Sequence, residues 1–190
     1  MRAPLLLAFL ALVVAAPTAC SSKDEPAKTS SKPVAPEPAF WGPDCDPLVP
    51  WHCGFPFPSN TQLADDPTSA TKKKVAFKTG QLPKWGGKDT NPAPWADNDG
   101  FSPSGTMTTF MWGATAKGLP TQDDLQTSIT TASKTIVMDA ETGELVPHWS
   151  EIDMLTKEDD QRDLMVRPVV RLKDATRYIV AIRGVVDADG

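Results

Sequence analysis

Histidine, the side chain most often used in acid–base catalysis, is scarce in this sequence. It contains two histidines, His52 and His148. A carboxylate follows His148 five residues later, at Asp153, and would orient the imidazole if the two side chains met. However, His148 comes directly after Pro147 on a predicted strand, and no serine accompanies it in a recognisable pattern. We therefore predict no catalytic residues and interpret His148 as a surface or edge histidine.

A serine nucleophile has no clear motif either. The nucleophile elbow of serine hydrolases needs Gly-x-Ser-x-Gly on a turn between a strand and a helix. The nearest match runs from Gly100 through Ser102 to Ser104, which lacks the second glycine and contains Pro103. An esterase that uses an unrecognised serine stays open as an alternative, and no cofactor is expected.

Metal ligands are also few. Asp97-Asn98-Asp99-Gly100 matches part of a calcium-binding loop, but the twelfth position of that pattern, normally glutamate, is Thr108. Two histidines supply a four-ligand zinc site poorly. We expect no metal and interpret Asp97–Asp99 as a polar turn, with calcium as the alternative.

The first twenty residues have the pattern of a targeting segment. Arg2 provides a positive charge, and an apolar run from Leu5 to Ala16 is too short to span a bilayer. Ala19-Cys20 follows and resembles a bacterial lipoprotein signal, in which the cysteine becomes the lipidated first residue; Pro17 departs from the usual aliphatic residue. We expect a signal peptide over residues 1–19 and lipidation at Cys20, rather than plain secretion.

Residues 20–40 are rich in proline, serine and charged residues and have almost no apolar side chains to bury. Such a composition predicts a disordered, extended tether. The chain is therefore expected in the bacterial cell envelope, anchored by lipid to the outer membrane or cell surface and lying outside the cytoplasm.

Lipidation of Cys20 would leave Cys45 and Cys53 as the remaining cysteines. Because the compartment beyond the inner membrane is oxidising, we expect a disulfide between them. Two free thiols or a metal pair are the alternatives.

Composition limits the classes of fold and partner. A chain of 190 residues suffices for one domain with appendages, and 19 prolines argue against long helices. The formal charge of −5 argues against nucleic acid as a partner.

Short β-like runs dominate the second half of the sequence. Residues 41–98 predict an irregular segment rich in proline and tryptophan, with one short strand at 73–78. Residues 99–190 predict a mainly β fold, an antiparallel Ig-like or fibronectin-III-like sandwich. Its expected strands are Thr106–Trp112, Thr135–Asp139, Leu145–Ile152, Leu164–Arg167 and Arg177–Arg183.

Three residues have the spacing of a tyrosine corner. Leu172 precedes a turn that ends in Thr176, and Tyr178 opens the next strand. In such a corner the ring lies in the core and the hydroxyl bonds to the backbone just upstream. A hairpin that merely contains an aromatic residue is the alternative.

The predicted sandwich is incomplete at its C-terminal edge. In an Ig-like sheet another strand lies beside the one that holds Tyr178, but here only Val185-Val186 and a turn follow it. We expect one edge of this strand to lack a partner, unless the segment around Phe55 and Phe57 covers it. An exposed edge predicts a marginal chain that dimerises or aggregates.

Several segments together carry a resemblance to a known family. The run from Arg167 to Val180 is the most specific of them. The others are Gly54–Asn60, Asp99–Ser102, Asp139–Glu144, Val146–Trp149 and the remainder of Leu172–Gly190. Together they resemble the N-terminal region of bacterial virulence-factor lipases, with its embedded bacterial Ig-like domain. The resemblance implies a surface lipoprotein in which this region precedes an α/β-hydrolase domain acting on lipid esters.

The sequence thus favours a non-catalytic, lipid-anchored envelope module, the N-terminal part of a secreted lipase- or esterase-like lipoprotein. Its expected partners are the membrane, through the anchor, and a downstream hydrolase domain. The alternatives are an esterase in its own right and an adhesin-like module that binds through exposed tryptophans.

Overall fold

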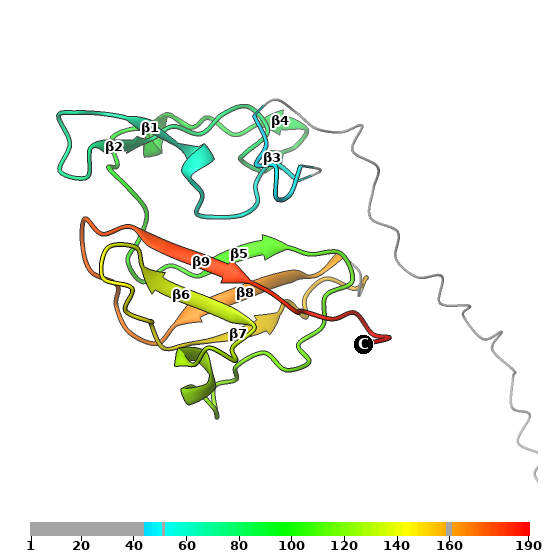
Figure 1. The fold of residues 1–190 in the computed structure, drawn as a ribbon. Helices are drawn as coiled ribbons and strands as arrows, with labels where there is room; N and C mark the ends of the chain where they lie inside the picture. Colours follow the sequence, from blue (N-terminus) through cyan, green and yellow to red (C-terminus); the bar gives the residue numbers. More distant parts are fainter. Residues whose placement is uncertain (1–43, 51, 159–160) are drawn as a thin grey trace, which may run out of the picture. The chain divides into compact units, whose positions relative to one another are not determined.

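The structure, a computed structural model, describes residues 44–50, 52–158 and 161–190 (Figure 1). The predicted signal peptide, Cys20 and the predicted tether lie outside the described residues. Within them the chain is mainly β, as predicted, and its helical turns are short 3-10 segments. No helix in this part of the chain has the length and apolar character needed to cross a bilayer.

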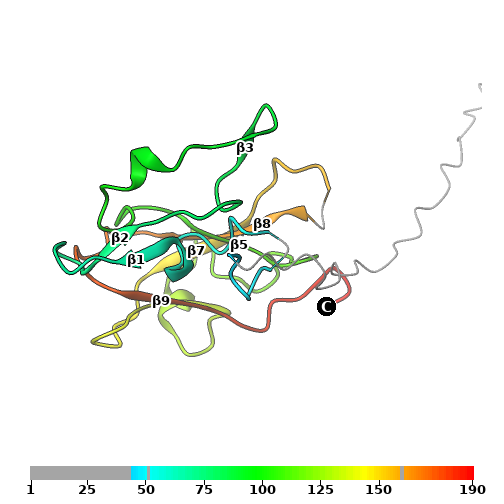
Figure 2. The same cartoon turned by 90° about the horizontal axis from the view of Figure 1, so that it is seen from above.

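Two antiparallel sheets form the second half of the chain. The first has the order β5–β8–β7, from Met107–Phe110, Asp163–Pro168 and His148–Ile152. The second pairs β6, Thr135–Asp139, with β9, Tyr178–Ile182. In Figure 1 the layer of β6 and β9 lies in front of the layer of β5, β8 and β7, and the turned view in Figure 2 also separates β9 from β7 and β8.

Side chains from both layers share one apolar core. Its buried members are Met107, Leu119, Val137, Val146, Leu164, Val166 and Leu172. Tyr178 and Ile182 of β9 pack against this cluster while remaining partly exposed. The shared core is the arrangement expected of a β-sandwich, in which each strand contributes alternate residues to the interior.

The alternation is clearest in β6, which has the predicted bounds. Thr135, Val137 and Asp139 are buried, and the two residues between them are less so. Successive side chains of a strand point to opposite faces, so these three residues form the inward row.

The strand predicted over Leu145–Ile152 is divided between the two sheets. Leu145 forms a bridge with Met138, and the Val146 amide donates to the Val137 carbonyl at 2.8 Å, so both residues extend the β6 layer. β7 begins only at His148, in the other sheet. Pro147 lies where the chain changes sheets, because proline has no N–H for a ladder.

Residues 44–100 contain more regular structure than the single strand predicted there. β1, Leu63–Asp65, pairs with β2, Lys73–Val75, and β3, Lys84–Trp85, pairs with β4, Lys88–Asp89. The β3–β4 turn is Gly86-Gly87, with φ of +57° and +76°, values that suit a tight hairpin and favour glycine. The 3-10 turns are η2 (Asn60–Gln62), η3 (Ala93–Trp95) and, between β5 and β6, η4 (Gln126–Ile129).

The aromatic segment joins β5 rather than β9. Phe57 donates its N–H to the Thr108 carbonyl at 2.8 Å and accepts the Thr108 N–H at 2.7 Å. Pro56 and Pro58 flank Phe57 and lack an N–H, which limits the pairing to this one bridge. In the described residues β9 pairs with β6 alone, so the cover that the sequence allowed at Phe55 and Phe57 is not on that edge.

Candidate functional site

The tyrosine corner is present at the connection between β8 and β9. The Tyr178 hydroxyl accepts the Lys173 amide at 2.9 Å, which is the predicted bond to the backbone just upstream. Leu172 is buried, and its amide donates to the Pro103 carbonyl at 2.8 Å. The Tyr178 ring packs against the core and remains partly exposed, on a strand whose far edge has no partner in the described chain.

Charged side chains surround this corner. The Lys173 ammonium lies 3.2 Å from an Asp139 carboxylate oxygen and 3.0 Å from one of Glu144. The backbone amides of Glu141 and Thr142 donate to Asp139 and, with Lys173, hold the pKa of its carboxyl below the usual range. Hydrogen bonds to Glu144 and Asp139 raise the pKa of Lys173. The charged forms of Asp139 and Lys173 are therefore stabilised, and the cluster ties the corner to the turn after β6.

Removal of the Tyr178 hydroxyl tests the corner. Tyr178→Phe is expected to lower the free energy of unfolding by about 1 kcal/mol, the net worth of one hydrogen bond. Urea unfolding of both proteins measures the difference. Thr176→Val serves as the comparison, because the Thr176 hydroxyl donates only to the nearby Asp174 carbonyl in an exposed turn. A Tyr178→Phe protein as stable as the parent contradicts the assignment.

His148 is fully buried, not at the surface as the sequence allowed, although it begins β7, an outer strand of its sheet. Its side chain points between the layers, where Nε2 lies 3.0 Å from the Thr135 hydroxyl and Nδ1 lies 2.8 Å from the Val146 carbonyl. The Thr135 hydroxyl also lies 2.9 Å from that of Ser150. Thr135 and Ser150 are themselves buried.

The Val146 carbonyl fixes which atoms donate and which accept in this network. A carbonyl oxygen only accepts, so Nδ1 of His148 carries a proton and donates to Val146. In the neutral ring Nε2 then accepts from Thr135, which leaves the Thr135 oxygen to accept from Ser150. Every polar atom of the imidazole has a partner, which is how buried polar groups are stabilised.

This geometry places a hydroxyl beside an imidazole, as in a nucleophile–base pair, yet the pair is enclosed by the core. The carboxylate of Asp153 does not orient His148: its oxygens accept from the Leu155 amide at 3.0 Å and the Thr156 hydroxyl at 3.4 Å. The Nδ1 position that such a carboxylate would occupy is taken by Val146. The cluster therefore stabilises the junction of β6 and β7 rather than presenting a reactive group.

The stability of the protein is expected to depend on the protonation of His148. Burial lowers its pKa below the ordinary value near 6.5, so between those two pKa values the unfolded chain binds more protons than the folded one. The contribution of neutral His148 to the free energy of unfolding is fully present above about pH 6.5. It is lost as the pH drops toward the lowered pKa, by at most about 1.4 kcal/mol per pH unit. Urea unfolding from pH 7.5 to 5 measures it.

His148→Gln is expected to remove that part of the pH dependence, and His52→Gln, at an exposed histidine, is expected to keep it. A parent protein whose stability does not change between pH 7.5 and 5 argues against a neutral buried imidazole.

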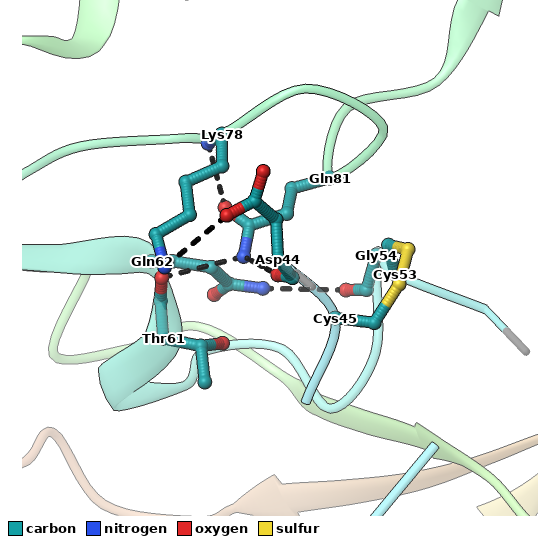
Figure 3. The surroundings of a disulfide bond; sticks show 8 residues. All are labelled: Asp44, Cys45, Cys53, Gly54, Thr61, Gln62, Lys78 and Gln81. Atoms are coloured by element: carbon teal, nitrogen blue, oxygen red, sulfur yellow. Dashed lines mark hydrogen bonds and ion pairs between the residues drawn. A yellow bond between two sulfur atoms is a disulfide. The ribbon is translucent and has the colours of Figure 1, made fainter. Parts of the chain in front are cut away.

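Cys45 and Cys53 form the predicted disulfide, with Cα atoms 4.3 Å apart (Figure 3). Two buried glutamines, which the sequence did not single out, bind the backbone around it. The Gln81 amide donates to the Asp44 carbonyl at 3.0 Å, and the Gln62 amide donates to the Pro56 carbonyl at 3.2 Å. These bonds hold the disulfide loop and the following proline-rich turn together.

The two weak motifs of the sequence form ordinary turns. The Ser102 carbonyl accepts the Gly105 amide at 3.1 Å, and its hydroxyl accepts the Ser104 amide, so no strand-to-helix elbow is present there. Asn98 accepts the Val75 amide through its carbonyl at 2.8 Å, which places the Asp97–Asp99 turn against β2. Among the described residues no three histidine, cysteine or carboxylate side chains gather in a way that would hold a metal ion.

The sequence contained one signal for the His148 network. Thr135 lies in the inward row of β6, and His148 and Ser150 alternate on β7, so three polar residues occupy positions that normally hold apolar ones. Polar residues on the buried face of a strand indicate a hydrogen-bonded cluster inside the fold.

The chain matches no family model, no curated protein and no solved structure.

Proposed function

We propose that this chain is a non-catalytic, lipid-anchored Ig-like module of the bacterial cell envelope. The observation that carries the proposal is the order of its first forty residues. The apolar run from Leu5 to Ala16 is followed closely by Ala19-Cys20, and a tether rich in proline and serine separates that cysteine from the folded part. A lipid on Cys20 would hold the β unit at a distance from the membrane.

The strand order supports the Ig-like part of the proposal. An Ig constant-type domain has strands A, B, E and D in one sheet and C, F and G in the other. β5, β8 and β7 take the places of B, E and D, and β6 and β9 take those of C and F. The tyrosine corner then lies between E and F, where Ig domains have it, and Phe57 occupies the place of strand A beside β5.

The enclosure of His148 supports a non-catalytic role. A general base has to reach the proton that it abstracts. Both ring nitrogens of His148 are engaged, and the residue has no exposed surface. In this proposal the module precedes a hydrolase domain that acts on lipid esters, as its resemblance to virulence-factor lipases suggests, and the chemistry belongs to that domain.

Replacing Cys20 tests the anchor. In a Gram-negative host, Cys20→Ser is expected to move the protein from the membrane fraction to the soluble fraction, because a thioether to lipid cannot form on serine. Mass spectrometry of the mature N-terminus is expected to show acyl chains on the parent and none on the variant. Ser22→Ala, two residues along the tether, serves as the control and is expected to stay in the membrane fraction. A Cys20→Ser protein that is equally membrane-bound and a parent without acyl chains would refute lipidation.

One observation favours a second candidate, an adhesin-like binding module. Trp85 is 88% exposed beside the glycine turn of the β3–β4 hairpin, between Lys84 and the turn. A large exposed aromatic side chain is a common anchor in binding surfaces. Binding of the folded chain to immobilised glycans or lipids, lost in Trp85→Ala, would favour this candidate over a passive spacer.

A further inference from the structure

The outer edges of the first sheet are occupied by other segments of the chain. At β5, Thr108 exchanges two backbone hydrogen bonds with Phe57. At β7, the Ser150 amide donates to the Pro120 carbonyl at 2.9 Å. These contacts satisfy backbone groups that an edge strand would otherwise expose.

The second sheet has one occupied edge and one open edge. Along β6, the Val137 carbonyl accepts the Val146 amide at 2.8 Å, and the Asp139 amide donates to the Glu144 carbonyl at 2.9 Å. Along the far edge of β9, no hydrogen bond to backbone or side chain is formed by any segment of the described chain. Among the outer strands of the two layers, β9 is thus the one whose edge makes no hydrogen bond within the described residues.

The ladder shows which backbone groups face that open edge. The Arg177 carbonyl accepts from Ala140, and the Arg183 amide donates to the Lys134 carbonyl at 2.8 Å, so odd-numbered residues of β9 face β6. Bonding groups alternate sides along an antiparallel strand. The N–H and C=O groups of Val180 and its even-numbered neighbours therefore point outward.

The interior of the fold is also open beside this edge. Val180 lies directly opposite Val137 in the ladder, on the inward face. Val137 is 1% exposed, whereas Val180 is 40% exposed. A valine in an inward row loses solvent contact when a strand lies on each side of it, so the exposure of Val180 marks an edge that no described strand covers.

The outward face of β9 limits what that strand can be. Arg177 and Arg183 stand at its two ends, with Ile179 and Ala181 between them. The Arg183 guanidinium donates to the carbonyls of Ser133 and Thr131, while Arg177 makes no side-chain hydrogen bond or ion pair within the described residues. Opposite charges across a strand pair are favourable and like charges are not.

A second copy of the chain fits this edge poorly. An antiparallel pair of β9 strands centred on Val180 would set Arg177 of each copy opposite Arg183 of the other, with like charges at both ends. An extended segment with acidic residues at its two ends would instead meet both arginines with opposite charge.

We propose that β9 takes up one extended strand from a partner protein, with apolar residues facing Val180 and acidic residues facing Arg177 and Arg183. The strand adds to the sheet through the outward backbone groups of β9, and its apolar side chains close the interior beside Val180. This proposal is independent of the lipid anchor, since it depends only on the described residues.

The test uses the full chain carrying Cys20→Ser and a synthetic peptide, Glu-Val-Thr-Val-Thr-Val-Glu. This sequence reads the same in both directions, so it offers its charges to either strand orientation. One control peptide replaces both glutamates with lysine. Another replaces the central valine with proline, which removes a ladder N–H.

Amide hydrogen exchange of β9 gives the specific readout. In the free protein Ile179 and Ala181, bonded to β6, are expected to exchange slowly, and Val180 and Ile182 quickly. The acidic peptide is expected to slow Val180 and Ile182 at least tenfold, and the proline peptide is expected to leave them unchanged. Arg177→Glu is expected to weaken binding of the acidic peptide about tenfold and to strengthen that of the lysine peptide.

Lys88→Glu makes the same charge change on the β3–β4 hairpin and is expected to change binding less than twofold. The proposal is overturned if the acidic peptide leaves Val180 and Ile182 unprotected at millimolar concentration, or if the acidic and lysine peptides bind equally. Protection of Val180 and Ile182 in the absence of peptide also overturns the proposal. If that protection increases with protein concentration, the edge of β9 pairs with a second copy of the chain. If it does not depend on protein concentration, the edge pairs with another segment of the same chain.

Discussion

Leu164→Ala is expected to lower the free energy of unfolding by about 2–5 kcal/mol, the range for deleting most of a buried leucine side chain. Leu164 has no exposed surface, and it lies in β8, which is paired on both sides. Its neighbours in the ladders are Thr109 of β5 and Ile152 of β7. The alanine would therefore leave a cavity between the two layers, in a strand that is held on both sides by neighbouring strands. The surrounding side chains cannot shift far enough to fill it.

Denaturant unfolding at pH 7.5 measures this loss, with Val170→Ala as the control. Val170 is 49% exposed just beyond β8, so its truncation is expected to change stability by less than about 0.5 kcal/mol. A Leu164→Ala protein within about 1 kcal/mol of the parent would mean that the two sheets do not share one close-packed core.

Opening the disulfide is expected to cost about 2.5 kcal/mol in the chain-entropy model, since Cys45 and Cys53 are separated by 8 positions in the sequence. The loss is expected in the segment that the disulfide and the buried glutamines hold together. The Gln81 side chain receives the Lys78 amide at 2.7 Å and donates to Asp44, so it links the start of the loop to the chain beyond β2 (Figure 3). Without the cross-link, Asp44 is more easily released and Gln81 loses a buried partner.

This expectation is measured in a Cys20→Ser background, where Cys45 and Cys53 are the remaining thiols. Reductant is expected to lower the stability of this protein and to leave a Cys45→Ala/Cys53→Ala variant unchanged. Two titratable thiols in the denatured, unreduced protein would show that the disulfide does not form under the conditions used.

Several features followed from the sequence because their contacts are local or their pattern is periodic. β6 has the predicted bounds, since a short run of β-prone residues that ends at a turn with a glycine defines a strand. The bond between Tyr178 and Lys173 spans five residues, so the spacing of the corner sufficed to predict it. The disulfide followed from the number of cysteines and the expected compartment.

Other features depended on which strands meet in space. The sequence predicted a surface or edge histidine at position 148, because it follows Pro147 on a predicted strand and no serine accompanies it in a recognisable pattern. Its burial depends on Thr135 of β6, thirteen residues away, facing it from the other layer. The division of the predicted 145–152 strand has the same origin, since only the tertiary structure shows that Leu145 pairs with β6 and His148 with β8.

Strand β9 shows both what the sequence determines and what the tertiary structure decides. Its amino acids by themselves determined a strand that is apolar on both faces, because Ile179, Val180 and Ile182 are β-branched and suit a pleated, buried surface. Which of its edges is paired was decided by the tertiary structure, through the ladder with β6 and through the bridge that places Phe57 at β5. Pairing joins backbone groups that every residue carries, so no side-chain pattern in β9 shows which of its two edges pairs with β6.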